Sequence, residues 1–500
     1  MIEALVSALS QFATPYVLML VVVAIPIGLV FGVLPGLGGL SALAILIPFV
    51  WGMDPLPGLA FLLACHAVVY TGGSVTSIVL GIPGSPPNAA TVIDGYPLCR
   101  QGKAGYAIGA ALMGSLLGGV VGVIVLIALI PILQPVALAF GSAETFFLAL
   151  IGIAFIGALG GNSPLKGLAA GALGIFLACF GAQRITGVPR FDMELDYLLD
   201  GFRIIPIALG LFAIPEVVGM MSTGSSVVPK DATQKVSWGQ VFDGCRQVVV
   251  RWGLFLRSSM IGVFVGIIPG VGGETAPFVA YAAARQSSTH PETFGKGEID
   301  GVIAPESGNN AKEGGSLVPT LAFGIPGSSG MAILLGAFLV LGLEPGPEFL
   351  KEHLDLAFGM AIVVAVANVL GGLAMIAVAP RIIAITRIRG HVLAPLLLGL
   401  VILGAYSTRN DAFDVVFTIV FGMLGIFMAR YDFSRPALLL GFVLGVQIET
   451  YLHISLNAFG PFFFTRPISA ALLALLLGAM IWPFARTRWA RRGADRAPAE

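Results

Sequence analysis

The densest group of polar side chains beside a long apolar stretch lies in the segment 304–315. The segment carries two carboxylates, an ammonium group, a hydroxyl and two amides: Glu306, Ser307, Asn309, Asn310, Lys312 and Glu313. Ionisable residues at membrane depth are costly and mark ion or ligand pathways. We therefore expect Glu306 to carry a proton or to ligate a cation. Lys312 either pairs with a bound carboxylate or pairs with Glu313 at the mouth of a site.

Neutral hydroxyl and amide groups form a second set of candidates. Those expected to bind a ligand are Ser74, Ser85, Asn88, Asn309, Asn310 and Ser328, and those expected to take part in ion coupling with Glu306 are Thr76, Ser307 and Ser316. Neutral donors bind a carboxylate without the cost of burying a permanent charge. Their oxygens also suit Na⁺, a hard cation. The alternative for any single serine or threonine is a hydrogen bond to its own helix.

Two glycine-rich motifs recur in the same order and position these polar groups. The first copy is Pro35-Gly36-Leu37-Gly38-Gly39 followed by Gly81-Ile82-Pro83-Gly84-Ser85, and the second is Pro269-Gly270-Val271-Gly272-Gly273 followed by Gly324-Ile325-Pro326-Gly327-Ser328. Proline and glycine break helices, and broken helices at matching positions of two halves point to a transporter's binding site. The glycines expected at that site are Gly36, Gly38, Gly39, Gly84, Gly270, Gly272, Gly273 and Gly327. The alternative is that they only permit tight helix packing.

Four more positions carry separate expectations. Gly84 and Gly327 are expected to adopt a positive φ, which would exclude a β-branched side chain. Glu274 stands where the first copy has Leu40, and it either acts in the site or lies at the surface. His66 lies in an apolar stretch and either titrates or simply packs. The segment 94–97 predicts a turn.

Composition places these motifs in a polytopic, all-α membrane protein. Hydrophobic residues make up 57% of the 500 residues and charged residues 11%, with a mean hydropathy of +0.95, which fits no soluble class. The net charge is zero, so nothing suggests nucleic-acid binding. The four cysteines show no metal or redox spacing and are expected to pack. No enzyme signature occurs, and without a P-loop the chain does not itself hydrolyse ATP.

A helix that crosses the membrane needs about 20 apolar residues. Clear candidates are 16–34, 104–130, 143–160, 164–183, 203–222, 252–268, 355–380, 391–408, 412–429, 435–451 and 467–485. The regions 41–90 and 275–343 are apolar but interrupted, and we expect each to mix helix with a re-entrant hairpin, the second at 305–343. In total we expect about 11 to 12 transmembrane helices plus two hairpin regions.

Charge predicts the orientation of the chain. The tail 486–500 is basic and the linker 223–251 carries Lys and Arg, so both are expected in the cytoplasm, with an amphipathic helix over 236–250. Arg100 and Lys103, after the first Gly-Ile-Pro-Gly-Ser motif, also fall inside. The acidic loop 343–354, after the second motif, falls outside. The halves 1–222 and 252–485 are therefore expected to be inverted repeats.

The repeat is expected to extend beyond the motifs. Gly28 and Gly32 match Gly262 and Gly266, a spacing that allows helices to approach closely. Gly72-Gly73-Ser74 is expected to match Gly314-Gly315-Ser316, and Gly118-Gly119 to match Gly371-Gly372.

Together these motifs resemble the TctA family, the large membrane subunit of the tripartite tricarboxylate transporters. The resemblance covers nearly the whole chain. It is carried by Gly28-xxx-Gly32 with the first glycine motif, by Tyr70-Thr71-Gly72-Gly73-Ser74 leading to the second, and by Ala304-Pro305-Glu306-Ser307-Gly308-Asn309-Asn310-Ala311 leading to the last. Lys312 and Glu313 depart from the small or neutral residues expected there, so no role is carried over to them.

The resemblance implies a permease in a bacterial inner membrane that imports citrate-like tri- or dicarboxylates with Na⁺ or H⁺ coupling. It implies two partners, a small four-helix membrane subunit (TctB-like) and a periplasmic solute-binding protein (TctC-like). No cofactor is expected apart from a possible bound Na⁺. The paired hairpins are similar to those of elevator-type ion transporters. The alternatives are a passive anion channel and a membrane scaffold or sensor that does not transport.

Overall fold

The computed structural model of the chain describes residues 1–34, 37–159, 163–183, 185–222, 236–269, 272–381, 390–407, 409–478 and 480. Gly36, Gly270, residues 223–235 of the linker and the tail 486–500 therefore lie outside the described residues. The described part is almost entirely helical, as composition predicts. The chain forms two compact units, which comprise 1–137 with 205–426, and 138–204 with 427–500.

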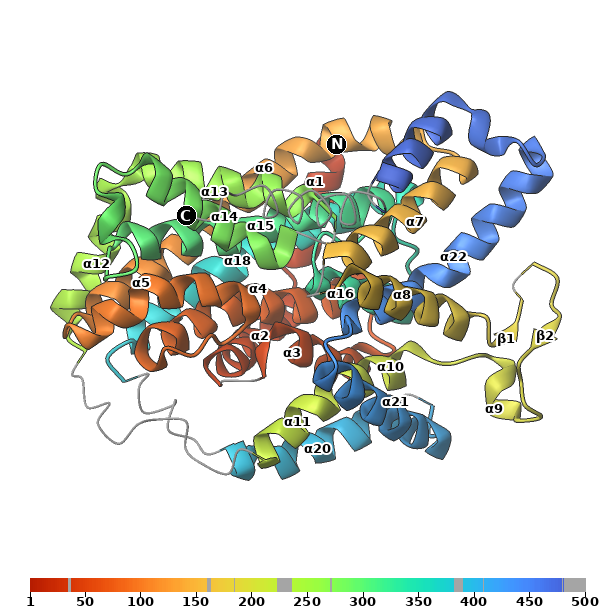
Figure 1. Cartoon of the computed structure of the whole chain (residues 1–500), viewed down its shortest axis with the longest axis horizontal. Helices are drawn as coiled ribbons and strands as arrows, with labels where there is room; N and C mark the ends of the chain where they lie inside the picture. The colour runs from red at the N-terminus through yellow and green to blue at the C-terminus, as the bar shows by residue number, and fades with distance from the viewer. Residues whose placement is uncertain are drawn as a thin grey trace, which may run out of the picture. The chain divides into compact units, whose positions relative to one another are not determined.

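The first unit contains both copies of the glycine motifs (Figure 1). Its helices before residue 139 are α1 (Ile2–Phe12), α2 (Pro15–Val33), α3 (Gly38–Leu46), η1 (Ile47–Val50), α4 (Pro55–Leu80), η2 (Pro86–Asn88), α5 (Ala89–Arg100) and α6 (Ala104–Leu138). Those that follow residue 203 are α10 (Ile204–Ala208), the π-helix η3 (Leu209–Ala213), α11 (Ile214–Ser222), α12 (Trp238–Val250), α13 (Trp252–Ile267), α14 (Gly272–Ser287), η4 (Pro291–Thr293), α15 (Asp300–Phe323), α16 (Ser329–Val340), α17 (Pro347–Glu352), α18 (Leu354–Val378), α20 (Gly390–Ser407) and α21 (Ala412–Arg430).

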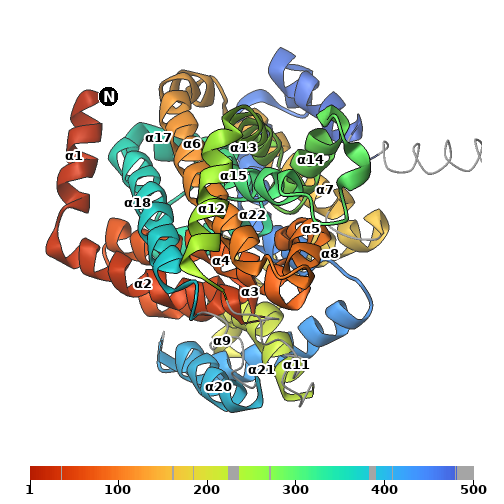
Figure 2. The ribbon, with the colours of Figure 1, turned by 90° about the vertical axis from the view of Figure 1, so that its left-hand side faces the viewer.

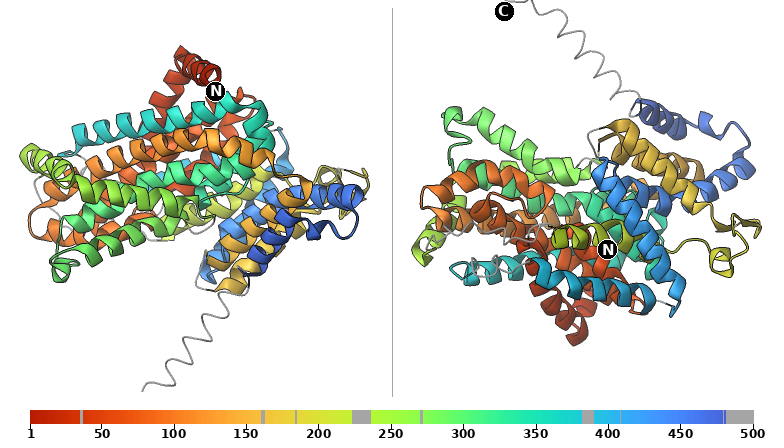
Figure 3. Two further views of the ribbon diagram at one scale, coloured as in Figure 1. Left: turned by 90° about the horizontal axis from the view of Figure 1, so that it is seen from above. Right: turned by 60° about the horizontal axis from the view of Figure 1, so that its bottom comes forward.

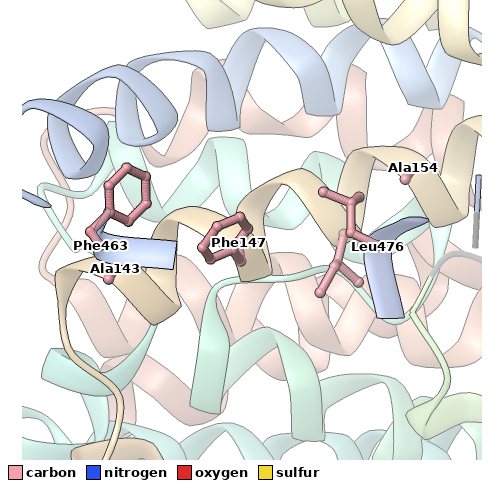
Figure 4. Packing of buried hydrophobic residues seen from close by; sticks show 6 residues of the cluster. Ala143, Phe147, Ala154, Phe463 and Leu476 are labelled. Atoms are coloured by element: carbon pink, nitrogen blue, oxygen red, sulfur yellow. The ribbon is translucent and has the colours of Figure 1, made fainter. Parts of the chain in front are cut away.

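The second unit has its own apolar core, shown in Figure 4. Its elements are α7 (Ser142–Leu159), α8 (Pro164–Ala178), the two-stranded sheet of β1 (Gly181–Ala182) and β2 (Pro189–Arg190), α9 (Asp196–Leu199), α22 (Arg435–Phe459) and η5 (Phe463–Thr465). Phe147 and Phe463 pack with Leu476 inside this unit. Beside them Glu144, 1% exposed, accepts hydrogen bonds from Ser469 and Arg466. The buried carboxylate is thus paired, as its desolvation requires.

Seven described helices are long and apolar enough to cross a membrane. They are α2, α4, α6, the continuous segment 204–221, α18, α21 and α22, and an eighth is added if α12 and α13, which are bent by 78°, count as one span. Other expected spans, such as 143–160 and 164–183, contain shorter apolar helices. The chain is therefore a multi-pass membrane protein, with fewer full-length described spans than the 11 to 12 expected.

Neighbouring helices in the first unit approach closely where the sequence has small residues. Figure 2 shows α1 beside α18, and Figure 3 shows the orange α6 alongside the cyan α18. On α6 and α18, Gly119 lies against Asn368 and Gly372 against Leu116. These glycines remove the side chains that would otherwise hold the two helices apart.

Candidate functional site

The long helices α4 and α15 carry most of the buried polar groups, and they run antiparallel. Ser74 lies 2.6 Å from Glu306, Thr71 lies 3.0 Å from Asn310, and His66 lies 3.2 Å from Glu313. Residue numbers fall along α4 while they rise along α15, so the two helices have opposite directions. Both are buried along almost their whole length.

Each of these helices packs against a shorter parallel helix through glycine. A Cβ atom on Gly28 or Gly32 of α2 would overlap the carbonyl oxygen of Cys65 or Val69 on α4. In the same way, Gly262 and Gly266 of α13 face the carbonyl oxygens of Gly308 and Lys312 on α15. The predicted match of these glycine pairs thus extends to their contacts, and in each pair the backbones lie as close as glycine allows.

The contacts correct the predicted match further along by one residue. Gly72 faces Leu29 O on α2, and its counterpart, which faces Val263 O on α13, is Gly315 and not Gly314. The Gly73 Cα atom lies beside Gly84, whereas the Ser316 Cα atom lies beside Gly327. This register is the one that also relates Gly81 to Gly324. The predicted match paired identical residue types, Gly-Gly-Ser with Gly-Gly-Ser, but these residues do not occupy equivalent positions on the two helices.

All four glycine motifs end or begin helices. Gly81 and Gly324, with φ of +69° and +66°, terminate α4 and α15 in the left-handed region, while Gly38 (φ +51°) begins α3. Gly84 and Gly327 do not have the positive φ that we expected. Glycine is needed there because a Cβ atom would overlap Gly73 on α4, or lie 2.5 Å from the Cα atom of Ser316 on α15.

The structure brings the motifs together within each half and across the halves. A Cβ on Gly38 would lie 3.2 Å from Ser85 Oγ, and Gly273 abuts Ser328. Ser328 also caps α16 by accepting a hydrogen bond from Met331 N. Across the halves, α3 packs against α16, and α14 packs against η2 and α5. Gly39 contacts the same side chain, His66, as Gly330 just after the last motif.

Glu306 lies at the centre of one polar cluster. It is fully buried and accepts hydrogen bonds from Ser74 Oγ at 2.6 Å, from Ser115 Oγ at 2.7 Å and from Thr91 Oγ1. Asn88 Nδ2 donates to Ser74 Oγ at 3.3 Å and to Tyr70 O. The partners of Glu306 in the described residues are all neutral, so this carboxyl group has no permanent counter-charge there.

Counting hydrogens shows that this cluster can hold a proton. Ser74 Oγ lies 2.9 Å from Tyr70 O and 2.6 Å from the Glu306 carboxylate, but a hydroxyl has one hydrogen to donate. If Ser74 donates its hydrogen to Tyr70 O, its 2.6 Å contact with Glu306 is a hydrogen bond only when the carboxyl group carries a proton and donates it to Ser74 Oγ. Protonation also removes the cost of an unpaired buried charge.

The other predicted polar residues divide into two groups. Asn310 Nδ2 donates to Thr71 and Asn368, while buried Asn309, Ser85 Oγ and Ser316 Oγ make no hydrogen bond among the described residues. Ser307 instead donates to Ile303 O on its own helix, and Thr76 lies 3.3 Å from Val33 O beside the first helix break. The buried polar atoms of Asn309, Ser85 and Ser316 are thus available to a ligand or to water, and buried polar groups normally have such a partner.

A second charged cluster lies further along the same two helices. Lys312 Nζ is 2.5 Å from Glu313 Oε1 and 3.9 Å from the centre of the Tyr70 ring, and His66 lies at the other oxygen of Glu313. Lys312 and Glu313 do pair, but they are 0% and 1% exposed and not at a mouth. Glu274, partly buried at the first turn of α14, lies within electrostatic range of Tyr70.

Sequence reasoning did not single out Ser115, Asn368 and Tyr70, and it misread Asp94, which lies outside these clusters. Ser115 and Asn368 stand in apolar spans, where a lone polar residue was the available signal. Tyr70 gave no signal beyond its place in the motif. The predicted turn at 94–97 is wrong, because these residues lie inside α5. There Asp94 accepts hydrogen bonds from the backbone N–H groups of 295, 297 and 298, each at 2.8 Å, and from Tyr281.

Comparison with known proteins assigns the chain to a family. The family described as "Tripartite tricarboxylate transporter TctA family" matches residues 18–440. A protein of Agrobacterium vitis described as "Uncharacterized 52.8 kDa protein in TAR-I ttuC' 3'region" is 32% identical over 481 residues, which cover 94% of this chain and 93% of that protein. A second, "Uncharacterized protein in TAR-II ttuC' 3'region", is 34% identical over 223 residues, covering 44% of this chain and 92% of that protein. No solved structure matches. The chain belongs to the tripartite tricarboxylate transporter TctA family.

Proposed function

We propose that this chain is the membrane permease subunit of a binding-protein-dependent secondary transporter that imports small organic carboxylates. The observation that carries the proposal is the antiparallel pair α4 and α15, with the four glycine motifs gathered around its buried polar groups. Helix breaks beside buried polar side chains form the binding sites of secondary transporters. Citrate-like tri- and dicarboxylates are the proposed substrates, with Na⁺ or H⁺ as the coupling ion.

The two halves are proposed to be inverted repeats. Matching glycine contacts relate α2 with α4 to α13 with α15, and the antiparallel directions of α4 and α15 are what inversion of one half requires. Such repeats support alternating access at a central site. An elevator-type movement of the hairpin-bearing part is the proposed form of that access.

The proposed substrate site uses the residues at the helix breaks. They are Gly36, Gly38, Gly39, Ser74, Gly84, Ser85, Asn88, Gly270, Gly272, Gly273, Asn309, Asn310, Gly327 and Ser328. Support comes from the buried, unpartnered polar atoms of Ser85 and Asn309 and from the helix N-termini that start at these glycines. Glu306, Ser316 and Thr76 are the proposed ion-coupling group. Ser307 is the weakest member, because its hydroxyl bonds to its own helix.

The proposed setting is a bacterial inner membrane, with the C-terminus in the cytoplasm. A small four-helix subunit (TctB-like) and a periplasmic solute-binding protein (TctC-like) are the proposed partners, as expected for a tripartite transporter. A passive channel is disfavoured because inverted hairpins suit alternating access rather than a continuous pore. A scaffold that does not transport would not explain why buried polar atoms lack hydrogen-bond partners among the described residues.

The test is uptake of labelled citrate into proteoliposomes that hold this chain and its small partner. The binding protein is added or omitted, and a Na⁺ or an H⁺ gradient is imposed, with di- and tricarboxylates as competitors. Accumulation that needs the binding protein and one gradient supports the proposal and identifies the ion. If folded protein accumulates no carboxylate under either gradient, the proposed substrate class fails.

A further inference from the structure

His66 on α4 is placed between the first turns of two helices that come from different halves. Its side chain is buried, with 2% of the residue exposed. A Cβ atom on Gly39, at the start of α3, would lie 3.4 Å from the ring Nδ1, and one on Gly330, at the start of α16, would lie 2.6 Å from Nε2. Both helices therefore present glycine to the ring, and a side chain at Gly330 would overlap the ring itself.

The ring nitrogens of His66 have no hydrogen-bond partner among the described residues. Glu313 Oε2 lies 3.2 Å from Nε2, yet the direction of approach does not make a hydrogen bond. A neutral imidazole has one donor and one acceptor to satisfy, and a protonated one has two donors. Ring nitrogens that make no hydrogen bond in the protein interior are costly, so we expect a polar ligand or a water molecule to bind them.

The neighbouring helix ends favour an anion as that ligand. The first N–H groups of a helix have no partner within the helix, and its N-terminus carries a partial positive charge. Here the ends of α3, with nine residues, and α16, with twelve, flank one unpartnered imidazole. We propose that His66 binds a carboxylate group of the transported anion, together with backbone N–H groups at the first turns of α3 and α16. This inference rests on the proposed transport function.

Charged groups on α15 and α14 lie near His66 and its neighbour Tyr70. On α15, Lys312 neutralises Glu313, to which it is bound at 2.5 Å. On α14, Glu274 adds a negative charge near Tyr70 of α4, and the flanking residues of α3 and α16 are uncharged glycines. Because Lys312 offsets the nearby Glu313 carboxylate, the partial positive charge of the two helix N-termini is what favours an anion at this place.

The second half provides a natural comparison for the test. In the register set by the glycine contacts, Asn309 on α15 is the counterpart of His66 on α4. It is also buried and unpartnered, but its amide cannot be protonated near neutral pH. The variant His66→Asn therefore replaces an ionisable donor with the neutral one that the chain already uses at the equivalent position.

The experiment measures KM and maximal uptake of labelled citrate in proteoliposomes with the complete transporter at one fixed pH. His66→Asn is compared with the wild type and with His290→Asn, whose side chain is 73% exposed. For His290→Asn we expect the wild-type KM. For His66→Asn we expect a KM raised about tenfold or more, with maximal uptake changed much less.

Two outcomes overturn the inference: a wild-type KM for His66→Asn, or a loss of maximal uptake with KM unchanged. Folding is checked by the unfolding temperature of the purified variant, and Gly330→Ala, whose Cβ atom would displace the ring, serves as a second variant that should also raise KM. If wild-type protein takes up no carboxylate, it is the proposed function that fails. Normal wild-type uptake with an unaffected His66→Asn rejects this inference alone.

Discussion

Glu306 is a buried carboxyl group that three hydroxyl groups surround. Ser74, Thr91 and Ser115 come from α4, α5 and α6 of the first half, whereas Glu306 lies on α15 of the second. A change in the protonation of Glu306 therefore acts directly on contacts between the two halves. An uncompensated charge at this depth is costly, which makes the group suited to releasing and accepting a proton during transport.

Replacing Glu306 with Gln is expected to reduce gradient-driven uptake at least about tenfold, because an amide cannot take up and release the proton that the proposed coupling requires. The hydroxyl groups can rotate to accept from the amide, so we expect the unfolding temperature to change little. Uptake and thermal unfolding are measured in parallel, with the exposed Glu348→Gln as the matched control. Full coupled uptake by Glu306→Gln would exclude Glu306 from ion coupling.

At the scale of elements, glycine sets how closely the helix breaks approach the long helices. Gly84 lies on Gly73 of α4, and Gly327 lies on Ser316 of α15. The left-handed turns that precede them are made by Gly81 and Gly324. In each Gly-Ile-Pro-Gly-Ser motif, the first glycine therefore provides the left-handed backbone conformation and the second allows close packing.

Gly84→Val and Gly327→Val are each expected to destabilise the protein by at least about 1–3 kcal/mol, the usual cost of overpacking, and to abolish uptake. Gly253→Val is the control, since a Cβ atom there meets nothing within 4 Å and exposed substitutions change stability by about 0.5 kcal/mol or less. Thermal unfolding in detergent checks the difference. Equal stability of all three variants would show that the breaks do not pack as described.

Asp94 connects α5 of the first half to the loop before α15 of the second. Its replacement by Ala leaves three backbone N–H groups without their acceptor, at a cost of about 1–3 kcal/mol for each buried group left unsatisfied. We expect faster cleavage by protease within 291–299 in Asp94→Ala than in wild type or in the exposed control Glu348→Ala. Unchanged cleavage would mean that Asp94 does not hold this loop.

At the scale of the whole molecule, the proposed inverted repeats predict that the segments after the two halves' motifs emerge on opposite sides of the membrane. Lys103 follows α5, and Lys351 lies in α17 after α16; both are exposed. If one half is inverted relative to the other, these two lysines are exposed on opposite sides of the membrane.

Single cysteines at Lys103 and Lys351, in a background without the four native cysteines, test this expectation. A membrane-impermeant maleimide applied to intact cells should label Lys351→Cys but label Lys103→Cys only after the membrane is opened, because the charge pattern predicts 351 outside and 103 inside. Labelling of both from the same side would reject the inverted arrangement. Uptake by each variant confirms that the labelled protein is native.

The sequence by itself determined the membrane class, most helix positions and the family. These properties follow from local signals: apolar length, the breaks at glycine and proline, and motifs such as Gly-Ile-Pro-Gly-Ser. The tertiary structure decided which residues meet. It paired Glu306 with hydroxyl groups of three other helices, buried the Lys312–Glu313 pair, left the ring nitrogens of His66 without a hydrogen bond among the described residues, and shifted the register of the repeat by one residue. Such pairings depend on which faces of distant helices come into contact, and local sequence patterns do not encode that information.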